Sequence, residues 1–189
     1  MNKWKVAFFL LVSAIVIFTT TIVIMALSPT EDAPLPEVKK AEGSVLLVET
    51  TTKDFEKLAL KYLGDALNTE SLPIAITVND QIQIFSEVIA FGVSVPVQID
   101  FEPVVNESGN IHLKYSKIHV GMLNIPPSTV LKLLEETIEL PAWVVIRPNA
   151  EEIFVDLSQL TVAEGSSVRA KEIDLKNDRI LLEVIVPNE

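Results

Sequence analysis

The segment from Val6 to Leu27 constrains this chain most strongly, because its 22 residues include no charged side chain. A helix of that length, at about 1.5 Å per residue, spans the hydrocarbon core of a bilayer. Its polar members are Ser13, Thr19, Thr20 and Thr21. We therefore predict a transmembrane anchor over residues 6–27. The alternative is a signal peptide cleaved at Ala26, but the apolar run exceeds the roughly 7–15 residues of a signal-peptide core.

The charges that flank this segment predict its orientation. Lys3, Lys5 and the terminal amine precede it, whereas Glu31 and Asp32 follow it. Because positive charge is retained on the inner side, residues 1–5 are predicted to be cytoplasmic and the C-terminal portion extracellular, in a single-pass protein of the cell membrane. Trp4 is expected at the inner interface.

The chain after the anchor divides into a tether and one domain. Residues 28–42 are rich in Pro, Glu, Asp and Lys, which predicts an extended tether, and residues 43–189 suit a single extracytoplasmic domain. Two of the 15 basic residues precede the anchor, so the outer portion has 13 basic against 26 acidic residues, a formal charge of −13. That charge argues against nucleic acid as a partner. The absence of cysteine excludes disulfides and cysteine-ligated metals.

Two segments have the period of an amphipathic helix. From residue 52 to residue 67, apolar side chains recur at spacings of three and four, and Thr51 and Asp54 are placed to cap the N-terminus. Pro126-Pro127 opens a second predicted helix, which runs to about residue 139. Its predicted buried stripe consists of Val130, Leu131, Leu134 and Ile138.

The remaining segments alternate with a period of two, which predicts strands. They are residues 74–78 and 81–84 in a hairpin around Asn79-Asp80, then 93–102, 111–118, 143–146, 153–157, and a final hairpin of 168–175 and 179–186. Pro96 predicts an edge position or a bulge. In the last strand, Ile180, Leu182, Val184 and Val186 are predicted to point inward. The fold class is α+β: a curved, mostly antiparallel sheet packed on two amphipathic helices.

The sequence contains no catalytic motif. His112 and His119 are separated by an odd number of positions, which would place them on opposite faces of a strand and disfavours a joint metal site. The acidic clusters are typical of solvated helix and hairpin surfaces, and they comprise Glu135, Glu136, Glu139, Glu151 and Glu152. We predict no catalytic residues, no metal site and no cofactor, and therefore a protein that is not an enzyme.

Three short segments resemble the YpmS-like family, an uncharacterised family of single-pass membrane proteins of Gram-positive bacteria. They are VGMLNIPP at 120–127, Leu140-Pro141, and KEIDLKND at 171–178. The resemblance implies a membrane-anchored protein of the cell envelope. The order of a long helix, antiparallel strands and a second helix is also similar, at the level of the fold, to tubular lipid-binding domains, in which a curved sheet wraps a helix around an acyl chain.

Strands rich in Val and Ile, covered by two helices, either close into a core or leave an apolar groove. The first hypothesis is a protein that binds a lipid or lipid-linked envelope molecule, with the groove lined by Val93, Val95, Val97, Ile99, Phe101 and Leu134. The alternative is an accessory subunit of a cell-envelope complex, which has a closed core and binds another envelope protein through a sheet edge or helix face.

Overall fold

The computed structural model describes residues 3–27, 32–36, 43–69, 72–90, 93–120, 125–160, 162 and 165–187. The chain divides into two compact units, residues 1–31 and residues 32–189.

The first unit contains one long helix, α1 (Lys3–Leu27). Within it, Trp4–Thr21 is long and apolar enough to cross a membrane, which makes α1 compatible with an anchor, although a signal sequence has the same features. The Thr19 hydroxyl donates to the Ile15 carbonyl at 2.8 Å, and Thr21 bonds in the same way to the preceding turn. These hydroxyls are therefore satisfied within the helix, which lowers the cost of placing them in lipid.

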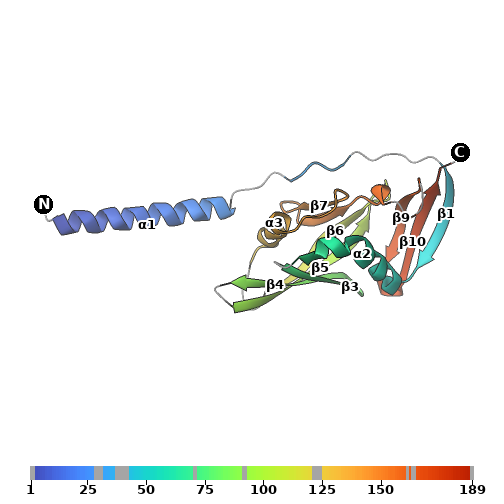
Figure 1. Cartoon of the computed structure of the whole chain (residues 1–189), viewed down its shortest axis with the longest axis horizontal. Helices are drawn as coiled ribbons and strands as arrows, with labels where there is room; N and C mark the ends of the chain where they lie inside the picture. Colours follow the sequence, from blue (N-terminus) through green and yellow to red (C-terminus); the bar gives the residue numbers. More distant parts are fainter. Residues whose placement is uncertain are drawn as a thin grey trace. The chain divides into compact units, whose positions relative to one another are not determined.

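The second unit is α+β, as predicted, and its described strands form two antiparallel sheets (Figure 1). The larger sheet has the strand order β2-β3-β4-β5-β6-β8-β7, and the smaller has the order β1-β10-β9. The strands are β1 (Ser44–Thr50), β2 (Asn68–Thr69), β3 (Leu72–Val78), β4 (Ile82–Ala90), β5 (Val93–Val105), β6 (Ile111–Val120), β7 (Val144–Arg147), β8 (Glu152–Val155), β9 (Ser167–Asp174) and β10 (Arg179–Val186).

Two helices cover one face of the larger sheet. Helix α2 (Thr52–Leu67) packs mainly on β3, and α3 (Pro127–Thr137) packs on β7. Both helices lie where the sequence period places them, and α3 ends two residues before its predicted end because the chain becomes extended at Ile138. Two 3-10 turns, η1 (Leu157–Gln159) and η2 (Leu175–Asn177), follow β8 and β9.

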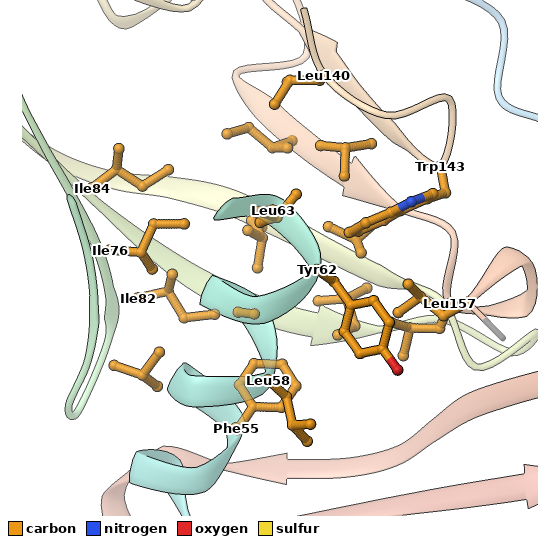
Figure 2. Close-up of a pocket in the computed structure, with 18 of the residues that line it drawn as sticks. Phe55, Leu58, Tyr62, Leu63, Ile76, Ile82, Ile84, Leu140, Trp143 and Leu157 are labelled. Carbon is orange, nitrogen blue, oxygen red and sulfur yellow. The ribbon is translucent and has the colours of Figure 1, made fainter. Parts of the chain in front are cut away.

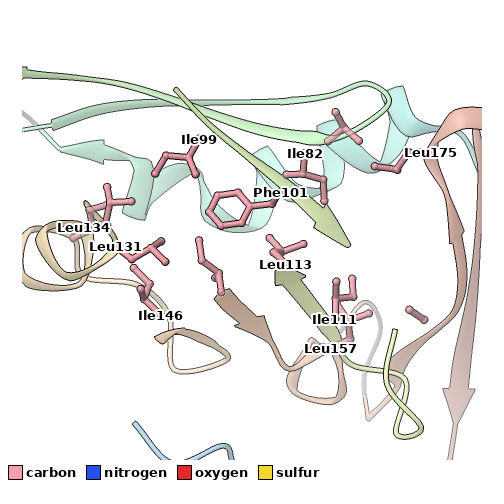
Figure 3. Packing of buried hydrophobic residues seen from close by; sticks show 14 of the residues in the cluster. Ile82, Ile99, Phe101, Ile111, Leu113, Leu131, Leu134, Ile146, Leu157 and Leu175 are labelled. Carbon is pink, nitrogen blue, oxygen red and sulfur yellow. The ribbon is translucent and has the colours of Figure 1, made fainter. Parts of the chain in front are cut away.

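The core lies between the helices and the larger sheet (Figure 3). Ile84 is paired with Ile99, and Ile82 with Phe101, so these side chains share one face of β4 and β5. Phe101 is fully buried, as is Leu131 of α3. The predicted buried stripe of the second helix is confirmed at all four positions, which are Val130, Leu131, Leu134 and Ile138.

Several details of the strands differ from expectation: β2 was not predicted, and β4 runs to Ala90 and not only to residue 84. Strand β1 was not predicted, and it pairs with β10 from the far end of the chain. Val186 was expected to point inward but is 38% exposed, whereas Ile180 and Leu182 are buried as predicted. The register of β10 on β9 shifts between Leu181 and Leu182, where Lys171 is the extra residue on the β9 side.

Pro96 lies in an interior strand of the larger sheet, where it faces Glu87 of β4. The position opposite Pro96 on the β6 side lies outside the described residues, so a local edge there stays a prediction. A bulge occurs in the pairing of β5 with β6, between Asp100 and Phe101.

Helix α2 is held at its N-terminus by a carboxylate from the opposite end of the chain. One Asp178 oxygen accepts hydrogen bonds from the Thr52 N–H at 2.8 Å and the Thr52 hydroxyl at 2.6 Å. The predicted local cap is also present, because the Thr51 hydroxyl oxygen accepts the Asp54 N–H at 3.2 Å. The hydrogen bonds from Thr52 hold the pKa of Asp178 below its ordinary value.

A short described part of the tether is bound to the domain. Residues 32–36 form neither helix nor strand, and both Asp32 carboxylate oxygens accept backbone N–H groups of the β7–β8 turn, from Asn149 at 2.9 Å and Ala150 at 3.1 Å. The rest of the predicted tether, residues 28–31 and 37–42, lies outside the described residues.

Replacing Asp178 with Gly should destabilise the domain at pH 7, because α2 loses its long-range cap. Asp178 has a φ of 52°, so glycine removes the carboxylate without adding backbone strain. Because folding depresses this pKa, the stabilisation is complete above the unfolded value of about 3.9 and is lost as pH falls through the folded value. Urea denaturation of both proteins from pH 7 to pH 2 should therefore show a difference that shrinks with acid.

Asp178→Asn is the matched control, since asparagine keeps an acceptor oxygen and tolerates positive φ. It should retain more stability at pH 7 than the glycine variant. A difference between Asp178→Gly and the parent that does not vary with pH would contradict capping by the carboxylate.

Candidate functional site

An apolar pocket lies between the two helices and the face of the larger sheet (Figure 2). One wall comes from α2, including Leu58, Tyr62 and Leu63, and another comes from Leu140 and Trp143, which connect α3 to β7. The volume is about 170 Å³. This exceeds the roughly 150 Å³ of apolar cavities that bind a benzene ring.

Among the described residues, every side chain that lines the pocket is aliphatic or aromatic, and none is charged. Their polar groups are the Tyr62 hydroxyl and the Trp143 indole N–H. The lining comprises Phe55, Leu58, Ala59, Tyr62 and Leu63 from α2; Ile74, Ile76, Val78, Ile82 and Ile84 from β3 and β4; Leu134 and Ile138 with Leu140, Trp143, Val144 and Ile146; and Ile111, Leu113, Ile153, Val155, Leu157, Leu160, Val162, Val168 and Leu182. Such a surface favours a hydrocarbon group over any ionic one.

The six residues predicted from the sequence to line a groove lie in different environments. Leu134 lines the pocket. Val97, Ile99 and Phe101 are buried in the core and are not lining residues, and Val95 is half-buried against that core. Val93 begins β5, but its side chain lies outside the described part of the chain. Contact of the β5 residues with a ligand stays a prediction.

The lining on β3 and β4 was not predicted, although its signal was present in the sequence. Ile74, Ile76, Ile82 and Ile84 alternate with polar or small residues as regularly as the β5 residues do. The stripe on α2 was also visible from its period. Periodicity identifies which side of each element is buried, but it does not identify which strand lies below the gap between two helices.

Acidic side chains stand on the helix that supplies Leu134. Burial raises the pKa of the Glu135 carboxyl, and the negative charges of Asp32 and Glu136 raise it further, while Lys132 opposes them. The Asp32 that fastens the tether to the domain is thus electrostatically coupled to α3. This negative potential disfavours an anionic group on the α3 side of the domain.

One acidic position predicted to be solvated is buried instead. Glu152 is 5% exposed; it forms an ion pair with Arg147 and a hydrogen-bond contact with His112, whose Nδ1 lies 3.1 Å from Oε2. The register places these side chains on the face opposite Ile111, Leu113 and Ile153, which line the pocket. The prediction for Glu152 was wrong because the sequence did not reveal that β7 and β6 flank β8 and supply both partners.

His112 and His119 both lie on β6, and His119 is exposed, whereas His112 is half-buried beside Phe154 at a ring separation of 5.0 Å. Among the described residues, no group of three or more His, Cys, Asp or Glu side chains is arranged to hold a metal ion. A polar hollow near Arg169 and Lys171 has both cations paired with Glu183, at 3.1 Å and 3.6 Å. The apolar pocket is therefore the candidate site.

Comparison with known proteins places the chain in a family. Residues 2–186 match the family described as "Uncharacterized protein conserved in bacteria (DUF2140)". The chain is 31% identical over 180 residues to the uncharacterized protein YpmS of Bacillus subtilis (strain 168), an alignment that covers 95% of each chain. The chain belongs to this family. The YpmS-like resemblance predicted from three short segments is confirmed over nearly the whole length, and no solved structure matches the chain.

Ile99 and Leu58 offer a matched test that separates the packed core from the pocket wall. Ile99 is 2% exposed, so Ile99→Ala should cost about 2–5 kcal/mol of unfolding free energy through lost contacts and a new cavity. Leu58 is 40% exposed at the pocket, so Leu58→Ala should cost less than about 1 kcal/mol. Urea denaturation of the two variants measures the difference. Equal, large losses would indicate that the pocket is closed by packing in solution.

Proposed function

We propose that this protein is a membrane-anchored extracytoplasmic protein that binds a lipid or a lipid-linked envelope molecule and catalyses no reaction. The observation that carries the proposal is the pocket between α2, α3 and the sheet, whose described lining residues are all aliphatic or aromatic. A folded domain gains stability by filling such a space with its own side chains. A gap that persists over the core is best explained by an apolar ligand.

The chemistry of the lining supports a hydrocarbon group as the ligand. Burial of an acyl chain gains about 0.8 kcal/mol per methylene, and an uncharged lining provides that gain without unpaired ionic groups. The volume of about 170 Å³ is below the roughly 300–1,000 Å³ typical of ligand pockets. Part of one chain therefore fits directly, and a longer chain requires α2 to move away from Leu140 and Trp143.

The tether supports proximity to lipid. Four residues separate Leu27 from Asp32 along the chain. At no more than about 3.6 Å per residue, they allow at most ~18 Å between the end of the apolar helix and the Asp32 that is bound to the domain. The basic residues before α1 and the acidic residues after it favour an extracellular position for the domain.

A binding role without catalysis is supported by the composition of the site. The described lining contains no Asp, Glu, His, Lys or Arg, which are the usual sources of general acid–base catalysis. The Tyr62 hydroxyl is the sole titratable group among the described lining residues. The same composition suits a ligand that is held by its apolar portion while its polar portion stays in water.

Filling the pocket should abolish binding while leaving the fold intact. Ala59 lines the pocket on α2, so Ala59→Phe places a ring inside it. Residues 28–189, which contain the second compact unit, would be incubated with monopalmitoylglycerol and examined by native mass spectrometry. The parent should carry one acyl adduct, and Ala59→Phe should reduce its occupancy about tenfold or more, equivalent to at least about 1.4 kcal/mol.

Leu60→Phe is the matched control, because Leu60 belongs to the same helix, is 39% exposed and does not line the pocket. It should bind like the parent. If the parent itself takes up no monopalmitoylglycerol and no palmitic acid, the lipid-binding proposal fails, and the alternative of an accessory subunit with a closed core takes its place.

A further inference from the structure

Strand β1 presents an unusual row of aliphatic side chains to solvent. Val45, Leu46, Leu47 and Val48 are 52%, 56%, 58% and 41% exposed, although they are consecutive in one strand. Successive side chains of a strand point to opposite faces, so both faces of β1 are apolar and uncovered. This pattern differs from an ordinary surface strand, in which only one face is apolar.

From Val45 to Glu49, the outer edge of β1 also has no partner strand within the described part of the chain. The smaller sheet has β10 in the middle, with β1 as one edge strand and β9 as the other. The β9 edge is partly covered, because η1 packs against it and the Ala170 N–H donates to the Gly109 carbonyl at 2.8 Å. Edge strands of monomeric proteins are commonly protected by a charge, a proline or a bulge, and Ser44–Val48 has none of these.

We propose that β1 pairs in antiparallel fashion with β1 of a second copy of this chain, about a two-fold axis at Leu47. The two smaller sheets then join into one sheet of the order β9-β10-β1-β1-β10-β9. The two-fold axis is perpendicular to the sheet, which requires that a residue at the centre faces itself. Leu47 faces Leu47 of the second copy, and Leu46 faces Val48, so the central pairs are all aliphatic.

The distribution of charge on β1 supports a second copy of the chain as its partner. Glu49 is the sole charged residue of β1, and Arg179 lies 3.7 Å from it on β10. Antiparallel pairing centred on Leu47 separates the two Glu49 side chains by four strand positions, or about 14 Å. That distance exceeds the Debye length of about 8 Å at physiological salt, so the two carboxylates repel each other weakly.

The size of the contact indicates where the dimer forms. Pairing of two seven-residue strands buries much less than the roughly 1,200 Å² of a stable complex in solution. Confinement of both copies to one membrane raises their effective concentration, and this compensates for the small binding free energy of the contact. The inference therefore rests on the anchoring role proposed for α1, and it is independent of the pocket and its ligand.

Cysteine cross-linking tests this register, because the natural chain has no cysteine. The full chain carrying Leu47→Cys would be oxidised in membrane vesicles and separated without reductant. Facing residues have Cα atoms about 4.5–5.5 Å apart, which suits a disulfide. Leu47→Cys should give about tenfold more cross-linked dimer than Leu46→Cys, whose two copies are about 8 Å apart, beyond disulfide range.

Two further measurements make the outcome decisive. Leu46→Cys and Val48→Cys chains expressed together should cross-link to each other, since these positions face across the axis. Val104→Cys, 42% exposed on β5, should give only the background of random collisions. Equal cross-linking at residues 47 and 104, or none in both the single and the paired experiment, would overturn the proposal.

Pairing of β1 with another protein, or in another register, would give different cross-linking results. A Leu47→Cys chain that remains monomeric in the membrane, but is protected there from a maleimide that labels the purified chain, would assign β1 to a strand of another protein and overturn self-pairing. A cross-link that is strong for Leu46→Cys and weak for Leu47→Cys would overturn the register centred on Leu47.

Discussion

The architecture of this domain depends on how much of the apolar face of the larger sheet two helices can cover. Seven strands at about 4.8 Å spacing make a surface roughly 29 Å wide, even before the sheet curves. Helices α2 and α3, each about 10 Å across, cover about 20 Å of it and are 16 and 11 residues long. The side chains below α2 and α3 pack into the core, and the pocket lies where the two helices do not meet.

Backbone N–H groups bound by carboxylates hold the covering elements in place. Asp178 binds the N-terminus of α2, and Glu56 of the same helix accepts the Val78 N–H at the end of β3 at 2.7 Å. Both carboxylate oxygens of Asp32 accept backbone N–H groups of the β7–β8 turn. Because a charged acceptor makes a stronger hydrogen bond than a neutral one, these few contacts compensate for the limited apolar contact of short helices.

Strands β6 and β8 have an apolar face and a polar face. On one face of β6 and β8, Ile111, Leu113 and Ile153 line the apolar pocket. On the other face, Glu152 is buried between Arg147 and His112. A buried ion pair adds little net stability but strongly disfavours any register that breaks it, because each charge would then be buried alone. The polar face therefore specifies the strand pairing on which the geometry of the pocket depends.

The sequence by itself determined the family and most of the helices and strands, because these depend on local period and on contiguous residues. The apolar segment at residues 6–27, the stripe on α2, the alternation around Ile82 and Ile99, and the VGMLNIPP segment are all readable along the chain. Tertiary structure alone decided the pairing of β1 with β10, the burial of Glu152 and the position of the pocket over β3 and β4 instead of β5. Each of these brings together residues distant in sequence, and periodicity identifies the buried side of a strand without identifying its neighbours.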